Sequence, residues 1–496
     1  MSSSFSVQKL HDVHDFFSLY LNDDDTSLVQ IKDIIVFESL YMRVFFPEKK
    51  KDVFYQLSRM DWSIIKQQYR EKFWPLWSVW RQLGRKEVQK EFYPLFLERP
   101  YHFFWSEWNI RLWDFMGGEE IPLVPWKDLL EREFRKTWYQ LEAPAKRIIN
   151  NISHPLVQRG MHLAFEMQEE NPAKISRLMM DFGYHEGRFN LPCGLEEMIE
   201  RELPSRFTSS YHHASFLLAK MVEKEFSWKE EKNVSAERLV LLEIERIKNH
   251  LNLLANVARL EKSYLLLRKI LQVEKRVLDL EAQYFFHYQI RPFQKNNFFP
   301  ERPGLILLEL NKIKEIVSSF KAPCSSRKIS FNEVKMMLEE GLTGPILRSV
   351  GINLDLRNQK NYLLYNRYAF KEVLSSHKNI GAIFHLFVQE ILSSMSIIDG
   401  ILGDYPSPSD CQQQEEEFIQ TDDFLFDKVE APMGELSCCL KINADKVITH
   451  LHFTSPHLSA AHFLTRYAPG KGRKEMEILL ALFNLMPQEI DILPST

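Results

Sequence analysis

The chain has 496 residues, which is enough for roughly two or three domains and a large apolar core. Apolar residues make up 45% of it and charged residues 26%, a balance typical of globular proteins. The net charge of −4 gives no electrostatic basis for binding nucleic acid or an anionic membrane surface.

Several site motifs are missing from the sequence. Neither GxGxxG nor GxxxxGK[ST] occurs, so no phosphate-binding loop of these types is expected. The five cysteines show no CxxC and no zinc spacing with histidine, which suits a reducing compartment. The chain opens without a signal-peptide pattern, and no run of about 18 apolar residues could span a membrane. We therefore expect a cytoplasmic protein that can still dock on a membrane protein.

Residues 1–150 form one predicted domain, an α/β domain rich in aromatic side chains. Residues 31–47 are β-branched and aromatic and predict one or two strands, and residues 64–96 have a helical pattern. Three tryptophans spaced three apart at 74–80 are typical of a core, the alternative being a docking surface. Nine of the ten tryptophans of the chain lie in this domain: Trp62, Trp74, Trp77, Trp80, Trp105, Trp108, Trp113, Trp126 and Trp138.

Residues 206–282 carry the strongest helical pattern in the chain. Their apolar side chains recur at steps of three and four, and leucines off this stripe predict a helix buried on most sides. Ser235 is the predicted N-cap. Glu243, Arg246 and His250 lie within the pattern at helical spacing. Because an unpaired buried charge is costly, we expect a structural ion pair between Glu243 and Arg246, beside a buried histidine.

The remaining segments predict further helices, a β-hairpin and a linker. Helices are expected at residues 305–320, 331–340, 368–402 and 456–492. Residues 428–453 alternate as in a hairpin, and residues 404–423 have the Pro-, Gln- and acid-rich composition of an exposed linker. The predicted fold class is α+β, mainly α.

Six stretches from about residue 150 onwards carry a resemblance to one family. They are HPLVQRG (154–160), GYHEG (183–187), RFTSSYHHASFLLAKMVEK (206–224), LEIERIKNHL (242–251), GLTGPILRSVGINLDLRNQKNYLLY (341–365) and EAPMGE (430–435, with Met433 where the family has arginine). In order and content they resemble the large subunit shared by respiratory complex I, its 49-kDa quinone-site subunit, and the [NiFe] hydrogenases.

The resemblance implies a domain at residues 151–496 with the central long-helix bundle of the hydrogenase large subunit and small peripheral β-sheets. In the N-terminal domain, EWNIRLWDFMGG (107–118) resembles a stretch of the 30-kDa subunit of complex I.

Departures from the family pattern bear on the chemistry. A hydrogenase holds nickel and iron with thiolates from two CxxC pairs, because soft metals need soft ligands. Here the first pair falls at Thr208 and Tyr211, and the second falls in residues 483–492, which contain no cysteine. The chain is therefore not expected to be a [NiFe] hydrogenase. The complex I branch binds a quinone between a tyrosine and a histidine, and these positions are Ser209 and Arg159 here.

Two further positions match the complex I pattern. Arg206 and His250 correspond to an arginine and a histidine beside the terminal iron–sulfur cluster, where positive or donor groups raise the cluster's potential. A neighbouring subunit holds that cluster, so the resemblance implies that this chain binds no cofactor itself. It implies as partners an iron–sulfur subunit and complex I or antiporter-like membrane subunits, and a cytoplasmic location peripheral to the inner membrane.

Three functions stay open from the sequence. The first is a peripheral-arm subunit of a complex I-like assembly whose own redox site is altered or lost. The second is an active electron-transfer subunit of the NADH:quinone oxidoreductase type, in which Ser209, Tyr211, His212, His213 and Arg159 handle a quinone and the histidines deliver protons. The third is a stand-alone interaction module that uses the tryptophan-rich domain.

Overall fold

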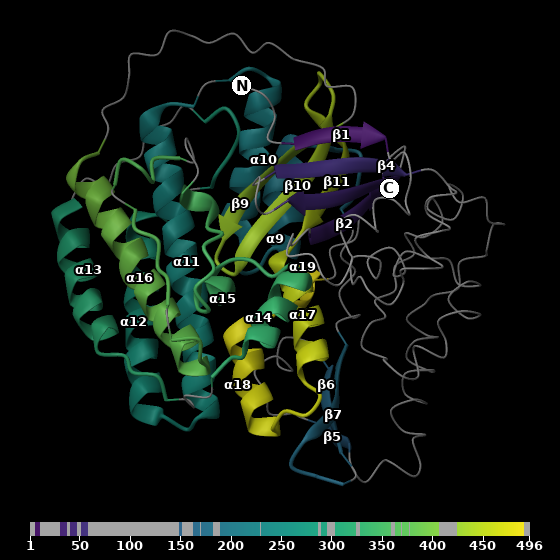
Figure 1. The fold of residues 1–496 in the computed structure, drawn as a ribbon. Coiled ribbons are helices and arrows are strands. Elements are labelled where there is room, and N and C mark those ends of the chain that lie inside the picture. Colours follow the sequence, from purple (N-terminus) through teal and green to yellow (C-terminus); the bar gives the residue numbers. More distant parts are fainter. Residues whose placement is uncertain are drawn as a thin grey trace.

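The structure is a computed structural model (Figure 1). It describes residues 5–9, 30–36, 40–46, 51–57, 148–150, 162–168, 170–181, 189–228, 230–285, 289–294, 303–323, 328–358, 363–368, 370–375, 377–405 and 424–490. Within them the fold is mainly helical, with three small β-sheets, as the sequence predicts. The helices are α8 (Leu195–Glu197), η5 (Met198–Glu202), α9 (Leu203–Arg206), α10 (Tyr211–Glu225), α11 (Lys232–Leu260), α12 (Tyr264–Tyr284), α13 (Pro303–Ser318), α14 (Phe331–Glu339), α15 (Pro345–Arg348), η6 (Leu356–Asn358), α16 (Ile380–Gly403), α17 (Pro456–Tyr467), α18 (Arg473–Phe483) and α19 (Pro487–Ile490).

Helix α11 lies at the centre of the helical bundle. Its 29 residues carry leucines both on and off the main apolar stripe, so most of its circumference is buried. It packs against α10, α12, α16 and α18 (Figure 1). The predicted core helix is therefore confirmed. The chain breaks between α11 and α12, where Lys262 adopts a positive φ of 54°.

Helix α16 is the second core helix of the bundle. Among the described residues it alone is long and apolar enough to cross a membrane, and 72% of its most apolar window is buried inside the fold. This burial is the pattern of a helix at the centre of a globular core. One acidic side chain, Glu390, lies in its middle and is fully buried.

Two sheets flank the helices. One is antiparallel, in the order β8 (Cys193–Gly194), β11 (Val447–Thr454), β10 (Gly434–Ile442) and β9 (Leu425–Ala431), so the hairpin predicted at 428–453 has a third strand. The other is N-terminal and mixed, in the order β1 (Phe5–Lys9), β4 (Lys51–Leu57), β3 (Leu40–Phe46) and β2 (Gln30–Val36). Strands β2 and β3 confirm the prediction for residues 31–47.

A third, small sheet is antiparallel. It consists of β5 (Ile148–Asn150), β6 (His162–Met167) and β7 (Ile175–Asp181). The helix predicted at 64–96 and the stretches 107–118, 154–160 and 183–187 lie outside the described residues.

Two predicted boundaries are wrong. Helix α11 begins at Lys232, with Glu231 as N-cap, because the amide of Ser235 already donates an intrahelical bond to the Glu231 carbonyl at 2.9 Å. Helix α16 begins only at Ile380, well after residue 368. The Asn379 side chain caps it there by accepting from the Ala382 amide at 2.7 Å.

Two glycines allow the 341–344 loop to lie directly on the β9–β10 turn. Gly344 has a φ of +73° and Gly434 a φ of +135°. A Cβ added to Gly344 would lie 2.4 Å from the Cα of Gly434, which is backbone and cannot move aside. Only glycine fits this crossing. The crossing brings the 341–358 segment onto β9 and β10.

Helix α14 begins with a capping box at Ser330. The Ser330 hydroxyl accepts from the Glu333 amide at 3.3 Å, and the Glu333 carboxylate accepts from the Ser330 amide at 2.7 Å. We expect Ser330→Ala to lower the free energy of unfolding by about 1 kcal/mol. Urea unfolding of the full chain measures this, with Ser318→Ala at an exposed helix end as control. Equal midpoints for the two variants would show that the box contributes little.

Candidate functional site

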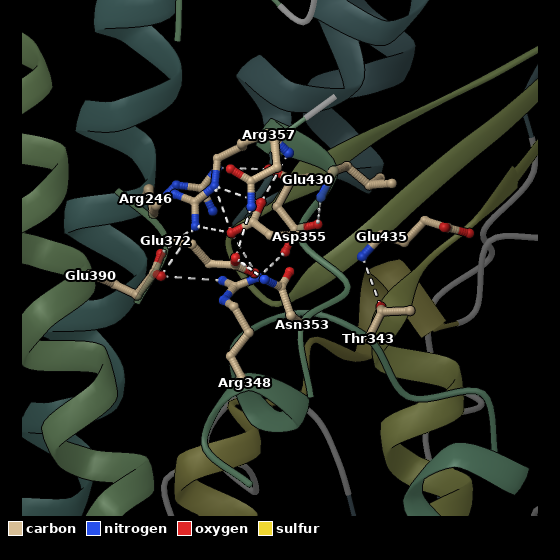
Figure 2. Close-up of polar contacts among 12 residues, drawn as sticks. Arg246, Thr343, Arg348, Asn353, Asp355, Arg357, Glu372, Glu390, Glu430 and Glu435 are labelled. Atoms are coloured by element: carbon tan, nitrogen blue, oxygen red, sulfur yellow. Dashed lines mark hydrogen bonds and ion pairs between the residues drawn. The ribbon is translucent and has the colours of Figure 1, made fainter. Parts of the chain in front are cut away.

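Helix α11, the 341–358 segment, helix α16 and strand β9 meet at one buried group of charges (Figure 2). We call it the arginine cluster. Every member is at most 6% exposed. Its members are Arg246, Arg348, Arg357, Glu243, Asp355, Glu390 and Glu430.

Arg348 and Arg357 lie in the 341–358 segment, and their ion pairs hold this loop to helix α16 and strand β9. Arg357 contacts Asp355 at 2.7 Å and Glu390 of α16 at 2.9 Å. Its guanidinium also lies 4.4 Å over the ring of Phe370. Arg348 contacts Glu430 of β9 at 2.7 Å, Asp355 at 3.1 Å and Glu390 at 3.3 Å. The loop is thus held by ion pairs in a dry environment, where breaking one leaves an uncompensated charge.

Arg246 joins α11 to the same group. Its Nε lies 3.3 Å from Glu243, and its Nη atoms donate to the carbonyls of Ala431 at 3.2 Å and Glu430 at 2.7 Å. The hydroxyl of Tyr365 donates to Glu243. The guanidinium therefore satisfies backbone carbonyls at the end of β9 as well as a carboxylate, which fixes the helix against the hairpin.

The pKa values of two acids in the arginine cluster shift in opposite directions. Burial acts to raise the pKa of Asp355, but the guanidiniums of Arg357 and Arg348 outweigh it and hold that pKa far below its usual range. Burial raises the pKa of Glu430, with Asp355 adding to the effect and Arg348 opposing it. Four carboxylates therefore face three guanidiniums in the cluster.

His250 lies one turn beyond Arg246 and is wholly buried. Its ring packs against Phe387 of α16 with centroids 4.8 Å apart. Neither ring nitrogen has a hydrogen-bond partner within the described part of the chain. Burial lowers the pKa of His250 well below its ordinary value, and Arg246 adds to the effect, so the imidazole is neutral.

A second polar group lies where α10 begins. We call it the glutamate clamp: Glu489 of α19 with Ser209, Ser210 and His457. The Glu489 carboxylate accepts from the Ser209 amide at 3.0 Å, from the Ser209 hydroxyl at 2.7 Å and from the Ser210 hydroxyl at 2.7 Å. His457 Nε2 lies 3.4 Å from it. Burial opposes ionisation, yet His457 and the serines lower the pKa of Glu489 below its ordinary value.

A third group joins the N-terminal sheet to the hairpin, and we call it the lysine joint. Arg43 of β3 contacts Asp52 at 2.9 Å and Glu435 of β10 at 2.6 Å. Lys428 of β9 contacts the same two acids at 2.7 and 3.1 Å. Lys32 donates to the Gly341 carbonyl at 3.0 Å. Three cations and two anions are thus buried between the sheets.

The structure brings together only some of the residues that the sequence points to. Glu243, Arg246 and His250 lie in or beside the arginine cluster. Ser209 lies in the glutamate clamp, and Arg206 is part-buried at the end of α9. Arg159 lies outside the described residues.

Three carboxylates central to these groups are absent from the sequence-based predictions. Glu390 is a lone acid in an apolar helix, which is a readable signal for a buried partner. Asp355 lies within the stretch that carries the resemblance. Glu489 carries no comparable signal, because its serine partners lie about 280 residues away in sequence. Among the described residues, no group of three or more His, Cys, Asp or Glu side chains is arranged to hold a metal ion.

Comparisons with known proteins give one consistent likeness. The model of the family "Respiratory-chain NADH dehydrogenase, 49 Kd subunit" matches residues 325–424, which include α14, α15 and α16. The D subunit of NADH-quinone oxidoreductase from Helicobacter hepaticus is 24% identical over 314 residues, covering 58% of this chain and 74% of that protein. The corresponding protein of Bacillus thuringiensis is 23% identical over 188 residues, and the match spans about half of its length, 51%.

A solved structure shares the fold. It is a chain from the membrane-bound sulfane sulfur reductase, described as an archaeal respiratory membrane complex. The TM-score is 0.56 at 17% sequence identity, covering 67% of this chain and 94% of that chain. The segment matched by the family model contributes Arg348, Asp355, Arg357 and Glu390 to the arginine cluster.

Proposed function

Because this chain is a distant member of the family of the 49-kDa subunit of respiratory-chain NADH dehydrogenase, we propose that it takes the place of that subunit in a complex I-related respiratory membrane assembly. The arginine cluster is the observation that carries this proposal. It joins the α11 stretch, the 341–358 segment and the β9–β10 hairpin, in which the resemblance lies, through ion pairs in the core.

In the finer form of the proposal the chain packs against an iron–sulfur subunit and holds no metal itself. Arg206 and His250 stand at the positions that the family places beside the partner's cluster. His250 is a neutral, wholly buried imidazole, so at that position it contributes a polar group without adding charge. Arg206 is part-buried and keeps its charge, which favours the reduced form of a nearby cluster.

The quinone-site residues differ in chemistry as well as identity. A quinone oxygen needs a hydrogen-bond donor, and the family supplies a tyrosine hydroxyl at the position of Ser209. Here the Ser209 hydroxyl donates to Glu489 at 2.7 Å, so its proton is already engaged. This supports an altered acceptor site in which Ser209 does not replace the tyrosine donor.

An active electron-transfer subunit is the second candidate. It is favoured by His212, a part-buried imidazole in the first turn of α10, whose Nδ1 has no hydrogen-bond partner within the described residues. Burial lowers the pKa of His212 below its ordinary value, so the neutral ring can accept a proton and pass it on. Under this candidate His212, rather than Ser209, faces the acceptor.

Purification of the tagged full chain from membranes of its own organism, in a mild detergent, tests assembly. We expect membrane-embedded subunits and an iron–sulfur protein to co-elute in fixed ratio, as quantified by mass spectrometry. Recovery of the chain as an iron-free monomer from the soluble fraction would overturn the proposal and leave the stand-alone module. Quinone reduction by the same purified assembly separates the two candidates. Reduction supports the active electron-transfer subunit, and no reduction supports the subunit with an altered acceptor site.

A further inference from the structure

Helix α12 carries a second line of apolar side chains on the side turned away from its core. The helix packs against α11 and α13 (Figure 1). Its buried stripe consists of Ile270, Val273, Val277 and Leu280. Away from that stripe, Tyr264, Leu271 and Leu278 are 68%, 44% and 45% exposed. They recur every seven residues, so they form a line about 21 Å long on one side of the helix.

These exposed side chains are not scattered over the surface. Single exposed leucines are ordinary in globular proteins and need no explanation. Among the described residues, however, eight large apolar side chains are exposed, and four of them lie on the 21 residues of α12. A strict seven-residue repeat is typical of the seam along which two helices of a coiled coil meet.

Two cations lie between the apolar side chains of this line. Arg268 and Lys275 are exposed, and neither forms an ion pair with another described residue. With the three apolar side chains they follow alternating steps of four and three, as the a and d positions of a heptad do. We call these five residues the α12 seam. They are Tyr264, Arg268, Leu271, Lys275 and Leu278.

Most other charges of α12 already have partners within the chain. Arg276 pairs with Glu309 of α13, and Glu281 contacts Lys248 of α11 at 2.7 Å. Asp279 is the only acid of α12 that is exposed, and it lies outside the seam. The seam therefore presents two unpaired cations between apolar side chains. A cation that becomes buried in an interface is destabilising unless an acid on the other side pairs with it.

This charge pattern selects one kind of occupant. A second copy of α12 running parallel places Arg268 against Arg268, and an antiparallel copy centred on Leu271 places Arg268 against Lys275. Both arrangements bring like charges together. A membrane surface suits a helix with a broad apolar face, whereas the exposed apolar line here has the narrow seven-residue repeat of a coiled-coil seam. A single helix with acidic side chains fits both the shape and the charge.

We propose that the α12 seam binds one amphipathic helix of a second protein. That helix carries aliphatic side chains at heptad spacing and Asp or Glu opposite Arg268 and Lys275. To cover the seam it needs at least about 15 residues. Burial of the apolar side chains provides the affinity, and the two charge pairs set the register. The seam lies outside the three polar groups described above, and its occupant is independent of an iron–sulfur partner.

Binding of two synthetic helical peptides to the purified full chain tests the proposal. Both peptides have about three heptads with leucine at the apolar positions, and they carry either glutamate or lysine opposite the two cations. Fluorescence anisotropy measures the affinities. We expect the glutamate peptide to bind about tenfold more tightly than the lysine peptide. Equal affinity for the two peptides, or no binding of either, would overturn the proposal.

Two variants locate the peptide on the seam. Leu271→Glu places a charge at the centre of the apolar line, and we expect it to weaken binding of the glutamate peptide at least about tenfold. Leu374→Glu changes an exposed leucine outside α12 and is expected to leave binding unchanged. Circular dichroism checks that both variants are folded. Equal effects of the two variants would show that the peptide binds elsewhere.

Charge reversal keeps the test decisive if Leu271→Glu does not fold. Arg268→Glu combined with Lys275→Glu is expected to reverse the preference, so that the lysine peptide binds more tightly. An unchanged preference for the glutamate peptide would overturn the proposal. Dimerisation of the wild-type chain, or its flotation with phosphatidylglycerol vesicles, would also overturn it if Leu271→Glu abolishes that association and the peptides are not distinguished. A soluble monomer that still distinguishes the peptides contradicts the proposed function and not this inference.

Discussion

Arg357→Met is expected to lower the free energy of unfolding by about 3–5 kcal/mol, because it leaves buried carboxylates without their partner. Asp355 and Glu390, both nearly or wholly buried, lose contacts of 2.7 and 2.9 Å, and Phe370 loses the stacked guanidinium. Equilibrium unfolding of the full chain in urea or guanidinium measures the change.

Two further variants test whether this loss of stability comes from the arginine cluster. Arg357→Lys keeps the charge but loses the planar fork, so we expect roughly half of the loss. Arg268→Met removes an arginine from the exposed side of α12 and is expected to change stability by less than about 0.5 kcal/mol. If Arg357→Met lowers the free energy of unfolding no more than Arg268→Met does, the arginine cluster does not hold the 341–358 segment to α16.

Lys32→Met is expected to stabilise the fold at neutral pH. Burial lowers the pKa of Lys32 from its ordinary 10.5 to about 8, with Arg43 and Lys428 adding to the effect and Glu435 and Asp52 opposing it. A shift of this size corresponds to roughly 3 kcal/mol of cost for the charged form. Methionine keeps most of the stem, and loss of the bond to Gly341 costs about 1 kcal/mol, which leaves a net gain of about 2 kcal/mol.

The pH dependence follows from the sign of the shift. Between about pH 8 and 10.5 the unfolded chain binds a proton at Lys32 and the folded chain does not, so wild-type stability rises with pH in that window. The advantage of Lys32→Met therefore shrinks as pH rises through it. Chemical unfolding at several pH values, with wild type and variant compared at each, measures this.

Lys428→Met is the matched control from the same joint, with the opposite expected sign. Lys428 contacts Asp52 at 2.7 Å and Glu435 at 3.1 Å, and although burial acts to lower its pKa, these acids raise it overall. Removing it leaves two acids to Arg43 alone and is expected to destabilise the fold. If both lysine variants lower the free energy of unfolding equally, the excess positive charge of the lysine joint does not destabilise the fold.

The helical bundle can be predicted from the sequence because its signal is local. The three- and four-residue steps of α11, with leucines around the circumference, determine both a helix and its burial. The predicted start of α16 is wrong, because Asn379 sets the helix start through one side-chain bond that apolar periodicity does not reveal. The division of the chain at residue 150 stays a prediction.

The polar groups are predictable only where both partners lie close in sequence. Glu243 and Arg246 are three residues apart on one helix face, so their pairing can be expected. Glu489 meets Ser209 and Ser210 only through the tertiary fold. Lys32 points into the joint because it is the extra residue of a β-bulge between Ile31 and Asp33, and strand alternation alone does not predict that reorientation.

The most direct test of the central claim, that this chain is a scaffold beside an iron–sulfur subunit and holds no metal of its own, is to locate the iron. The purified assembly is reduced, examined by electron paramagnetic resonance, and then dissociated so that each subunit's iron is measured. We predict a cluster signal in the intact assembly, with the iron retained by the partner and absent from this chain. An assembly without a cluster signal, or iron that stays with this chain, would contradict the claim.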